Sequence, residues 1–538
     1  MIPQLAFDVV VVGMGPVGTL AANLLGIRGI KTLIIDKDAD IYPSPRAIAF
    51  DHDAMRILQG CGLAEVIEPF IAPYAPSEYH GVDGRVISRF DMQAPPYPLG
   101  WAPNYVFRQP PFEAALREGL RRFNCVEVRT PCEFLSFEQK DHYVRISLDD
   151  GLYTEPITAG YLLGVDGGAS MVRRLLGGGM ASLDFDEPWL VVDALISDEA
   201  LEKLPSTIIQ YCDPSRPATY VIGTGNHRRW EIRLSPSEST EALQDERAVW
   251  DLLSPWLQPD EGVLWRWATY DFHAVVANVW RSGRVLLSGD AAHMTPPFMA
   301  QGMTQGVRDV ANLVWKLVRV LEGRAGDSLL DTYMQERAPH VRATTEVAKG
   351  LGRVICETNP VAASERDAKM IAEFGNPPAV RSRQAMIPNL SAGLILENSA
   401  AAGSVFPQPF VVYDDERRRF DDIIGREPFL VIRSEADAIE MTPATTALCD
   451  EYQVQIVVLN VDTDTQVTCT ISVTEEHTLL GDWFAEHHCI AVFVRPDFYV
   501  FGSAATSADI EKLCQMWIKS PACFPIAENG GAGDRLSK

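Results

Sequence analysis

The sequence predicts an α/β protein with a parallel sheet and at least one further domain, and three observations support this fold class. A buried β-branched strand at residues 9–12 leads into a glycine-rich turn, a helix and a second strand. Short aromatic and β-branched segments alternate over residues 189–270, which is typical of an antiparallel sheet. A chain of 538 residues exceeds the size of one hydrophobic core, so two or three domains are expected.

Composition excludes several classes of partner. A formal net charge of -25 disfavours binding to nucleic acid and to anionic membranes. No window approaches the ~18 uninterrupted apolar residues of a membrane span, and no basic segment precedes the first apolar run, as a signal peptide would require. The ten cysteines form no CxxC pair and no metal-ligand spacing. We therefore expect a cytoplasmic protein with reduced thiols and no metal site.

The first motif is a GxGxxG turn directly after the first strand. Its glycines are Gly13, Gly15 and Gly18. The first glycine permits a tight turn, the second lets backbone N–H groups approach a pyrophosphate, and the third lets the helix pack closely. The second strand, at residues 32–35, ends in Asp36 and Lys37, so a carboxylate lies where a ribose hydroxyl would sit. An ordinary βαβ unit could carry such glycines, but the complete order of elements favours dinucleotide binding.

Two polar residues beyond this unit are candidates for contacting a cofactor. Arg46 lies in a proline-containing loop after the ribose-binding acid, and Gln109 lies at the start of a predicted helix. Either residue also has an ordinary interpretation: Arg46 could pair with a surface aspartate, and Gln109 could cap its helix.

Two later motifs repeat the pattern of a strand that ends in an acid and glycines. Asp166 follows an apolar strand and precedes a helix start, so a long ligand could be held from two sides. Residues 283–303 then run from strand through loop to helix, and they contain Asp290 and His293. The free N–H groups at the start of that helix, near Gly302, can face a developing negative charge.

These three motifs in this order resemble the class A flavoprotein monooxygenases, the aromatic hydroxylases related to p-hydroxybenzoate hydroxylase, over roughly the first 350 of the 538 residues. The chain is most similar to the branch of 3-(3-hydroxyphenyl)propionate hydroxylases. The segments that carry this similarity include Pro45-Arg-Ala-Ile48, Asp166-Gly-Gly-Ala-Ser170, Arg229-Trp-Glu231 and Gly289-Asp-Ala-Ala-His293.

The resemblance implies three domains. They are a Rossmann-like FAD-binding domain of the glutathione reductase type (1–75, 106–185 and 280–395), an inserted antiparallel-sheet substrate-binding domain (76–105 and 186–279) and a thioredoxin-like C-terminal domain (405–538). Because the last of these contains no CxxC pair, we expect it to serve packing or homodimer formation instead of redox chemistry.

The resemblance also implies the cofactor and the residues that hold it. FAD would bind to Gly13, Gly15, Gly18, Asp36, Lys37, Arg46, Gln109, Asp166, Asp290, Pro297, Gly302 and Met303. In this assignment Arg46 and Gln109 contact the pyrophosphate and ribityl region, Pro296 and Pro297 line the flavin ring, and the Gly302 and Met303 amides face its pyrimidine edge. His293 is interpreted as a structural part of its motif.

The implied reaction is hydroxylation of a phenolic ring, with NAD(P)H as reductant and O2 as oxygen source. A phenol reacts better as phenolate, so a nearby hydroxyl or imidazole should draw off its proton. Tyr270, at the end of a predicted strand over residues 263–270, is the candidate for orienting the phenol. His273 and Arg46 are the other catalytic candidates. Tyr270 could instead be a core tyrosine with a satisfied hydroxyl.

The substrate and some alternatives stay open at this level. The predicted substrate is 3-(3-hydroxyphenyl)propionate or a related phenol of aromatic catabolism, and the alternative is a larger polycyclic or secondary-metabolite phenol. Arg216, Arg229 and Arg233 are candidates for holding a substrate carboxylate. A flavin-dependent halogenase is disfavoured because its WxWxIP motif is absent, and a plain NAD-dependent dehydrogenase would not need the Asp290 segment. A non-enzymatic flavin-binding protein is the remaining class.

Overall fold

The computed structural model describes residues 4–91, 94–151, 154–238, 240–433, 443–459 and 471–523. The chain divides into two compact units. Met1–Val314 and Arg337–Asn389 form the first unit, and Trp315–Glu336 and Leu390–Lys538 form the second. Among the described residues, no helix combines the length and apolar character needed to cross a membrane.

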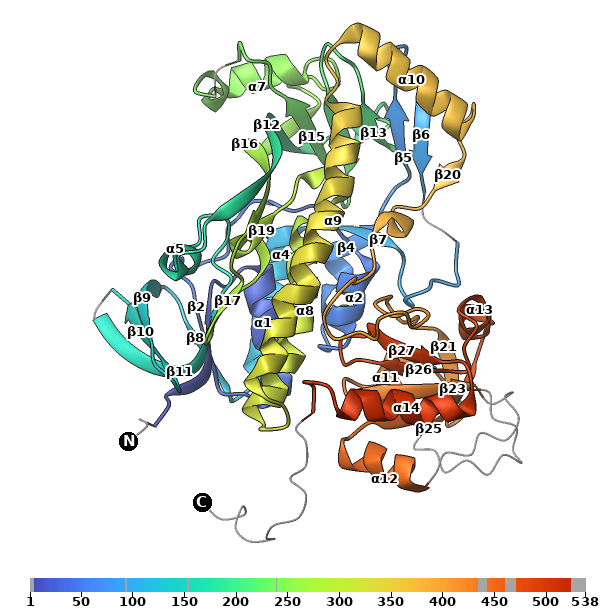
Figure 1. Ribbon diagram of the computed structural model, residues 1–538. Coiled ribbons are helices and arrows are strands. Elements are labelled where there is room, and N and C mark those ends of the chain that lie inside the picture. Colours follow the sequence, from blue (N-terminus) through green and yellow to red (C-terminus); the bar gives the residue numbers. More distant parts are fainter. Residues whose placement is uncertain are drawn as a thin grey trace. The chain divides into compact units, whose positions relative to one another are not determined.

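The first unit contains the predicted parallel sheet (Figure 1), with strand order β17-β18-β11-β1-β2-β8. Its strands are β1 (Phe7–Val12), β2 (Thr32–Ile35), β8 (Val126–Arg129), β11 (Thr154–Gly164), β17 (Arg281–Ser282) and β18 (Val285–Leu287), and β9 (Glu133–Gln139) and β10 (Val144–Asp149) extend β11 antiparallel. Strands β8, β2, β1, β11 and β18 are parallel. The three motifs follow β1, β11 and β18, so they meet at the carboxyl edge of this sheet.

The glycine turn adopts the predicted strand–turn–helix form. Helix α1 (Pro16–Ile27) follows β1, with proline at its first position, where the missing N–H costs no hydrogen bond. Gly13 has φ +106°, and a Cβ at Gly18 would collide with the Gly13 carbonyl oxygen. The first and third glycines are therefore required by the fold itself.

The second sheet of this unit has nine strands in the order β19-β16-β12-β15-β14-β13-β5-β6-β20. They are β5 (Ser77–His80), β6 (Val86–Phe90), β12 (Met180–Ile196), β13 (Ile208–Tyr211), β14 (Ala218–Ile222), β15 (His227–Arg233), β16 (Gly262–Ala277), β19 (His293–Met294) and β20 (Val380–Arg381). The central strands are antiparallel as predicted, but β13 pairs with β5, and β6 with β20, in parallel. The expectation of an antiparallel sheet is therefore wrong for these two pairs, whereas the neighbouring pair β5–β6 is antiparallel.

Strand β16 also differs from its prediction, because it continues past Tyr270 to Ala277. The extension pairs with the first half of β12, for example His273 with Asp186. Pairing along the long β12 strand keeps this stretch extended. Tyr270 therefore lies within a strand.

Helices and a small three-stranded sheet complete the first unit. The small sheet contains β3 (Ala49–Asp51), β4 (Ile71–Pro73) and β7 (Asn104–Phe107). The remaining helices are α2 (His52–Gln59), α3 (Ala64–Ile67), α4 (Gln109–Gly119), α5 (Met171–Leu176), α6 (Asp198–Leu201), α7 (Glu246–Leu253), α8 (Gly302–Leu321), α9 (Asp331–Ile355) and α10 (Pro360–Phe374). Helices α8 and α9 continue into the second unit. Helix α8 has a buried apolar face, because Val310, Leu313 and Leu317 recur at helical spacing and are fully buried.

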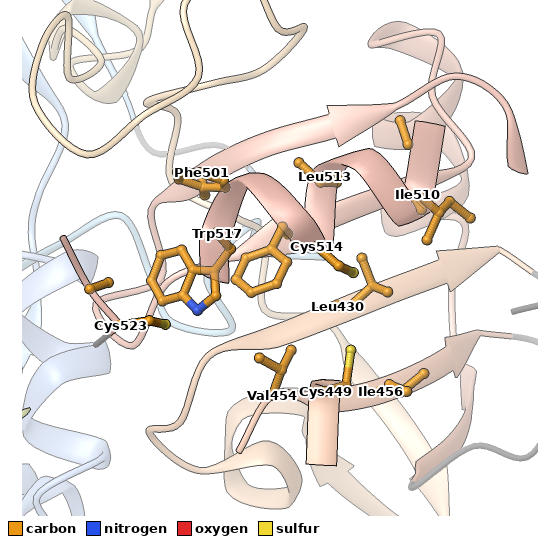
Figure 2. Packing of buried hydrophobic residues seen from close by; sticks show 14 of the residues in the cluster. Leu430, Cys449, Val454, Ile456, Phe501, Ile510, Leu513, Cys514, Trp517 and Cys523 are labelled. Atoms are coloured by element: carbon orange, nitrogen blue, oxygen red, sulfur yellow. The ribbon is translucent and has the colours of Figure 1, made fainter. Parts of the chain in front are cut away.

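The second unit has a seven-stranded sheet in the order β22-β21-β25-β24-β23-β26-β27. Its strands are β21 (Phe410–Tyr413), β22 (Glu416–Arg419), β23 (Phe429–Arg433), β24 (Gln455–Leu459), β25 (Ile471–Glu475), β26 (Ala491–Val494) and β27 (Val500–Ala504), and its helices are α11 (Phe420–Ile424), α12 (Pro443–Glu451), α13 (Leu479–Glu486) and α14 (Ser507–Ile518). Figure 2 shows the layer between α14 and the sheet, where Trp517 and Leu513 lie near Phe501 and Leu430.

A buried charge cluster lies in the same unit. The Glu336 carboxylate accepts hydrogen bonds from Lys316 Nζ at 2.8 Å and from the Arg495 guanidinium at 2.7 Å. It also accepts one from the Leu394 backbone N–H at 2.9 Å. Burial opposes its ionisation, but the two cations outweigh burial and lower the pKa of Glu336 to about 2. This ionised carboxylate joins residues 315–336 to the C-terminal sheet of their unit.

Candidate active site

Two adjoining cavities, of about 670 and 510 Å³, lie in the first unit. The smaller cavity follows the carboxyl edge of the parallel sheet, and the larger one continues over the face of the nine-stranded sheet. Both are lined by Gly15, Tyr42, Arg46 and Gln109, so they form one groove. Their volumes are typical of ligand sites.

The residues predicted to bind FAD or to orient the phenol line this groove, with the exception of Pro296. Of the three arginines predicted for a substrate carboxylate, Arg229 lines it, whereas Arg216 and Arg233 do not. The smaller cavity is lined by Gly13, Asp36, Lys37 and Asp166. The larger cavity is lined by Gly18, Tyr270, His273, Asp290, Pro297, Gly302 and Met303. Arg46, Gln109 and Gly15 belong to both. Segments more than 250 residues apart in the sequence thus meet at one site.

The glycine turn leaves room for a ligand. A Cβ at Gly15 would meet no protein atom within 4 Å, in contrast to Gly13 and Gly18. Asp36 stabilises the turn, because its Oδ2 accepts a hydrogen bond from the Met14 N–H at 2.7 Å. The open space therefore lies where the pyrophosphate of FAD would approach the backbone, and the turn fits such a cofactor.

Gln109 holds the loop that carries Arg46. Gln109 Oε1 accepts hydrogen bonds from the backbone N–H groups of Arg46 and Ala47, at 2.7 and 2.6 Å. Gln109 therefore secures this loop, and its alternative interpretation as a helix cap is wrong. The Arg46 guanidinium stacks 4.4 Å from the centre of the Tyr42 ring. Among the described residues no carboxylate forms an ion pair with it, so Arg46 offers a positive charge between the two cavities.

The two acidic motif residues have different surroundings. Asp166 Oδ2 accepts hydrogen bonds from the Met171 and Val172 N–H groups at 2.7 and 3.1 Å, so this carboxylate binds the start of α5. Asp290 opens onto the larger cavity. The protein around that cavity raises the pKa of Asp290 by desolvation, and the positive charges of His293 and Arg46 oppose this rise.

A buried network lies beneath the Asp290 loop. Asp309 of α8 accepts hydrogen bonds from Gly289 N–H at 3.1 Å and Arg337 Nε at 2.8 Å, and its Oδ2 lies 2.6 Å from His293 Nε2. Burial opposes ionisation of Asp309, but His293 and Arg337 hold its pKa below the ordinary value. His293 is fully buried in this network, which is the structural position expected for it.

The start of α8 forms one end of the larger cavity. A Cβ at Gly302 would meet no atom within 4 Å, so the first turn of the helix is open to a ligand. Arg308 fixes this turn, because its guanidinium donates to Asp51, Asp53 and the Gln301 side-chain oxygen. The free N–H groups of a fixed helix end can stabilise negative charge on a bound ring.

Tyr270 and His273 reach the cavity from β16. Tyr270 is 38% exposed, and the Arg266 guanidinium lies 5.3 Å from the centre of its ring. Within the described part of the chain its hydroxyl has no hydrogen-bond partner, so it is not a satisfied core tyrosine. His273 Nδ1 lies 2.5 Å from Asp186 Oδ1, which orients the imidazole.

Sequence reasoning missed a polar row on the floor of the larger cavity. Gln210, Thr219 and Glu231 are neighbours across β13, β14 and β15, and all three line the cavity. The Thr219 hydroxyl donates to Gln210 Oε1 at 2.6 Å. Burial raises the pKa of Glu231 to about 7, with Arg229 opposing and Asp193 adding to the rise. The available signal was the two-residue spacing of Arg229 and Glu231, which puts both on one face.

Another cavity residue, Arg383, was also missed, because it lies far along the chain near β20. Within the described ranges, no group of three or more His, Cys, Asp or Glu is arranged to hold a metal ion.

The chain matches two protein families. The family described as "FAD binding domain" matches residues 6–348, and the family described as "HcaD C-terminal domain" matches residues 403–519. A protein named "Probable NADH-specific resorcinol 4-hydroxylase" from Rhodococcus jostii (strain RHA1) is 35% identical over 97% of this chain and 96% of its own length. A "3-(3-hydroxy-phenyl)propionate/3-hydroxycinnamic acid hydroxylase 2" from Burkholderia vietnamiensis (strain G4 / LMG 22486) is 32% identical over 92% and 93%.

Solved structures share the fold. The flavin-dependent monooxygenase PieE, in complex with FAD and substrate, superposes with a TM-score of 0.77 at 20% identity, over 96% of this chain and 99% of its own. Aklavinone-11 hydroxylase, in a ternary complex with FAD and aklavinone, gives a TM-score of 0.76 at 23% identity, again over 96% and 99%.

Gly15 has open space around a Cβ position and Gly18 does not, and this difference gives a first prediction. Gly15→Ala should weaken FAD binding at least about tenfold, equal to about 1.4 kcal/mol, and leave the unfolding temperature of the FAD-free protein unchanged. Gly18→Ala should destabilise the FAD-free protein by about 1–3 kcal/mol, because its Cβ overpacks the turn. Fluorescence titration with FAD and thermal unfolding measure the two effects. Equal loss of stability in both variants would contradict the open site at Gly15.

The buried Glu231 gives a pH-dependent prediction. Its pKa in the folded state, about 7, exceeds the ordinary 4.5. Ionisation in the folded state therefore costs stability, and this cost grows as the pH rises from below 4.5 to above 7. Glu231→Gln removes the cost, so its free energy of unfolding relative to the original protein should increase by about 3 kcal/mol between pH 4 and pH 8. Urea unfolding across this range measures the difference, and a pH-independent difference would refute it.

Proposed function

The chain belongs to the family of FAD-dependent class A aromatic hydroxylases, which act on phenolic rings, and we propose that its own substrate is 3-(3-hydroxyphenyl)propionate or a closely related phenol of aromatic catabolism. The observation that carries this proposal is the single groove that runs from the glycine turn to the polar floor of the second sheet. We propose NADH as the reductant, because the Rhodococcus relative is named NADH-specific.

The proposal places FAD along the smaller cavity and the adjoining part of the larger one, and it places the substrate at the other end of the larger cavity, over the polar floor of the nine-stranded sheet. The ADP half of FAD would bind along Gly13, Gly15, Gly18, Asp36 and Lys37. Arg46 and Gln109 would contact the pyrophosphate and ribityl region, and Asp290 would bind the ribityl group or the pyrophosphate. Asp166 belongs to a motif that would serve both FAD and the nicotinamide cofactor. When bound, FAD accepts electrons from NADH and activates O2 for insertion into the ring of the substrate. Pro297 and the first turn of α8 face the flavin, where the Gly302 and Met303 amides stabilise negative charge.

Tyr270 is proposed to orient the phenol. Its hydroxyl has no protein partner among the described residues, and its strand faces the cavity, so it can accept or donate a hydrogen bond to the substrate hydroxyl. His273 stands three residues further along the same strand as the second candidate for moving the proton. The apolar residues of the cavity wall, including Phe298 and Val191, exclude water from the reacting ring.

We also propose the finer domain assignment. The FAD-binding domain comprises 1–75, 106–185 and 280–395, and the substrate-binding domain 76–105 and 186–279. The C-terminal domain, 405–538, is proposed to be thioredoxin-like. Support comes from its parallel β23–β24 pair around α12, followed by the antiparallel β26–β27 hairpin and α14. Without a CxxC pair it would serve packing or a homodimer, in a cytoplasmic protein.

Purified protein tests the function directly. We expect a yellow protein in which a phenol accelerates NADH oxidation, with matching O2 uptake and a new hydroxyl group on the ring. A panel of 3-(3-hydroxyphenyl)propionate, resorcinol and a polycyclic phenol, compared by rate of flavin reduction, identifies the preferred substrate class. Preference for the polycyclic phenol, or protein that cannot be reconstituted with FAD, would reject the proposal.

The role of Tyr270 gives a further prediction. Tyr270→Phe should lower the hydroxylation rate about 100-fold while FAD stays bound, because the variant lacks only the hydroxyl that orients the phenol. The measurement is hydroxylated product formed per NADH consumed. Tyr211→Phe is the matched control, because Tyr211 lies on β13 but does not line the cavity. Unchanged coupling of NADH use to product in Tyr270→Phe would exclude the role.

A further inference from the structure

The substrate end of the larger cavity contains a buried arginine without a partner carboxylate. Arg383 is 7% exposed and lines the cavity. One terminal nitrogen donates to the Tyr74 hydroxyl at 3.2 Å and the other to Ser77 Oγ at 3.0 Å. Its Nε–H is buried without a hydrogen-bond partner. Among the described residues, no carboxylate forms an ion pair with Arg383.

Such an arrangement is unfavourable without a ligand. A buried guanidinium gives up its hydration, and two neutral hydroxyl acceptors replace only part of it. The rings of Tyr74 and Phe90, whose centres lie 5.1 and 5.6 Å from the guanidinium, add a modest cation–π attraction. A planar cation with an unused donor at a cavity wall is suited to a carboxylate, which guanidinium groups bind in a two-pronged manner.

The arginines that the sequence offered for this task are already engaged. Arg229 binds Asp193, with Nε 2.7 Å from Oδ1, inside the sheet. Arg216 and Arg233 bind Glu238 and Glu187, at 2.8 and 2.6 Å. Neither Arg216 nor Arg233 lines the cavity. Arg383 is therefore the cavity arginine whose charge the described residues leave uncompensated at the substrate end.

The end of the cavity floor that lies away from Arg383 carries an acidic residue, Glu231. Glu231 lies on β15, and Ser77, which binds Arg383, lies on β5, three strand positions away in the order β15-β14-β13-β5. At ~4.8 Å per strand, the two backbones are about 14 Å apart. Glu231 is 7% exposed, and no hydrogen bond from a described residue reaches its carboxyl. Its nearest cation is Arg229, whose Nη1 lies 3.9 Å from Glu231 Oε1 and which is already paired with Asp193. An acid at this end repels a carboxylate and accepts a hydroxyl proton, so the floor discriminates between the two ends of a substrate.

We propose that Arg383 binds the side-chain carboxylate of a phenolic acid, whose ring hydroxyl then points toward Glu231 and Tyr270. This inference rests on the proposed function and narrows it: the preferred substrates are phenols that carry a carboxylate on a short chain, in contrast to neutral phenols such as resorcinol. Gln210 and Thr219 lie between the two ends and contact the substrate along its length.

The test compares two substrates that differ only at the anionic end, 3-(3-hydroxyphenyl)propionate and 3-(3-hydroxyphenyl)propan-1-ol. The holoenzyme should prefer the acid, and Arg383→Met should reduce the ratio of kcat/KM values, acid over alcohol, at least about 30-fold, through KM. Arg383→Lys keeps the charge but loses the planar fork, so it should retain part of the preference. If Arg383→Met does not fold, Arg383→Lys still tests the proposal.

Two further measurements make the result specific. Arg216→Met removes an arginine that is paired outside the cavity, and it should leave the substrate preference unchanged. Binding of 3-phenylpropionate, followed by the change in FAD absorbance, should weaken by the same factor in Arg383→Met, which reports binding without turnover. Glu231→Gln should lower kcat for acid and alcohol alike and leave their ratio unchanged.

The outcomes separate this inference from the proposed function. If the holoenzyme hydroxylates acid and alcohol equally well, or if Arg383→Met keeps the preference for the acid, the carboxylate site is overturned and the phenol hydroxylase stands. If neither phenol accelerates NADH oxidation, the proposed function fails and this assignment fails with it.

Discussion

The buried ion pair between Arg229 and Asp193 fixes the geometry on which both halves of the groove depend. The pair spans β15 and β12, with Nε 2.7 Å from Oδ1. The same guanidinium donates to the backbone carbonyl oxygens of Arg46 and Pro45, at 3.0 and 3.3 Å. Burial opposes ionisation of Asp193, but Arg229 and His227 lower its pKa. A charged pair inside one sheet thus holds the loop that presents Arg46 to the other cavity, and buried pairs of this kind specify geometry more than they add stability.

Asp309 acts in the same way at the other side of the groove. It joins the Gly289 N–H, His293 and Arg337, so the strand–loop–helix around Asp290 is tied to α8 and α9. In both networks a buried carboxylate stays ionised because arginine and histidine surround it. The functional groups at the cavity surface therefore rest on elements with little freedom to move, which is the arrangement that a closely positioned ring and oxygen donor require.

The proposed cofactor end of this groove was predictable from the sequence, and the proposed substrate end was not, for a physical reason. Gly13, Asp166 and Asp290 each follow a parallel strand, and neighbouring parallel strands present their carboxyl ends at one edge, so local patterns sufficed. The position of Glu231 in the cavity depends on which strands pair with one another. The position of Arg383 depends on the two-residue strand β20, which precedes it at the sheet edge. The role of Gln109 depends on a contact across 63 residues. Such long-range register leaves no periodic trace in the sequence.

The net charge of -25 is compatible with the proposed site for several anions once distance is considered. In physiological salt, exposed charges are screened beyond about 8 Å, so the acidic surface repels a long polyanion such as nucleic acid but has little effect inside a cavity. Inside the cavity, the nearest charged groups determine whether an anion is attracted. Arg46 stands between the two cavities and Arg383 at the substrate wall, each without an ion-pair partner in the part of the chain that the structure describes. A small anion that enters the groove therefore meets fixed positive charge at the positions proposed for a pyrophosphate and a carboxylate, and the global charge selects against larger competitors.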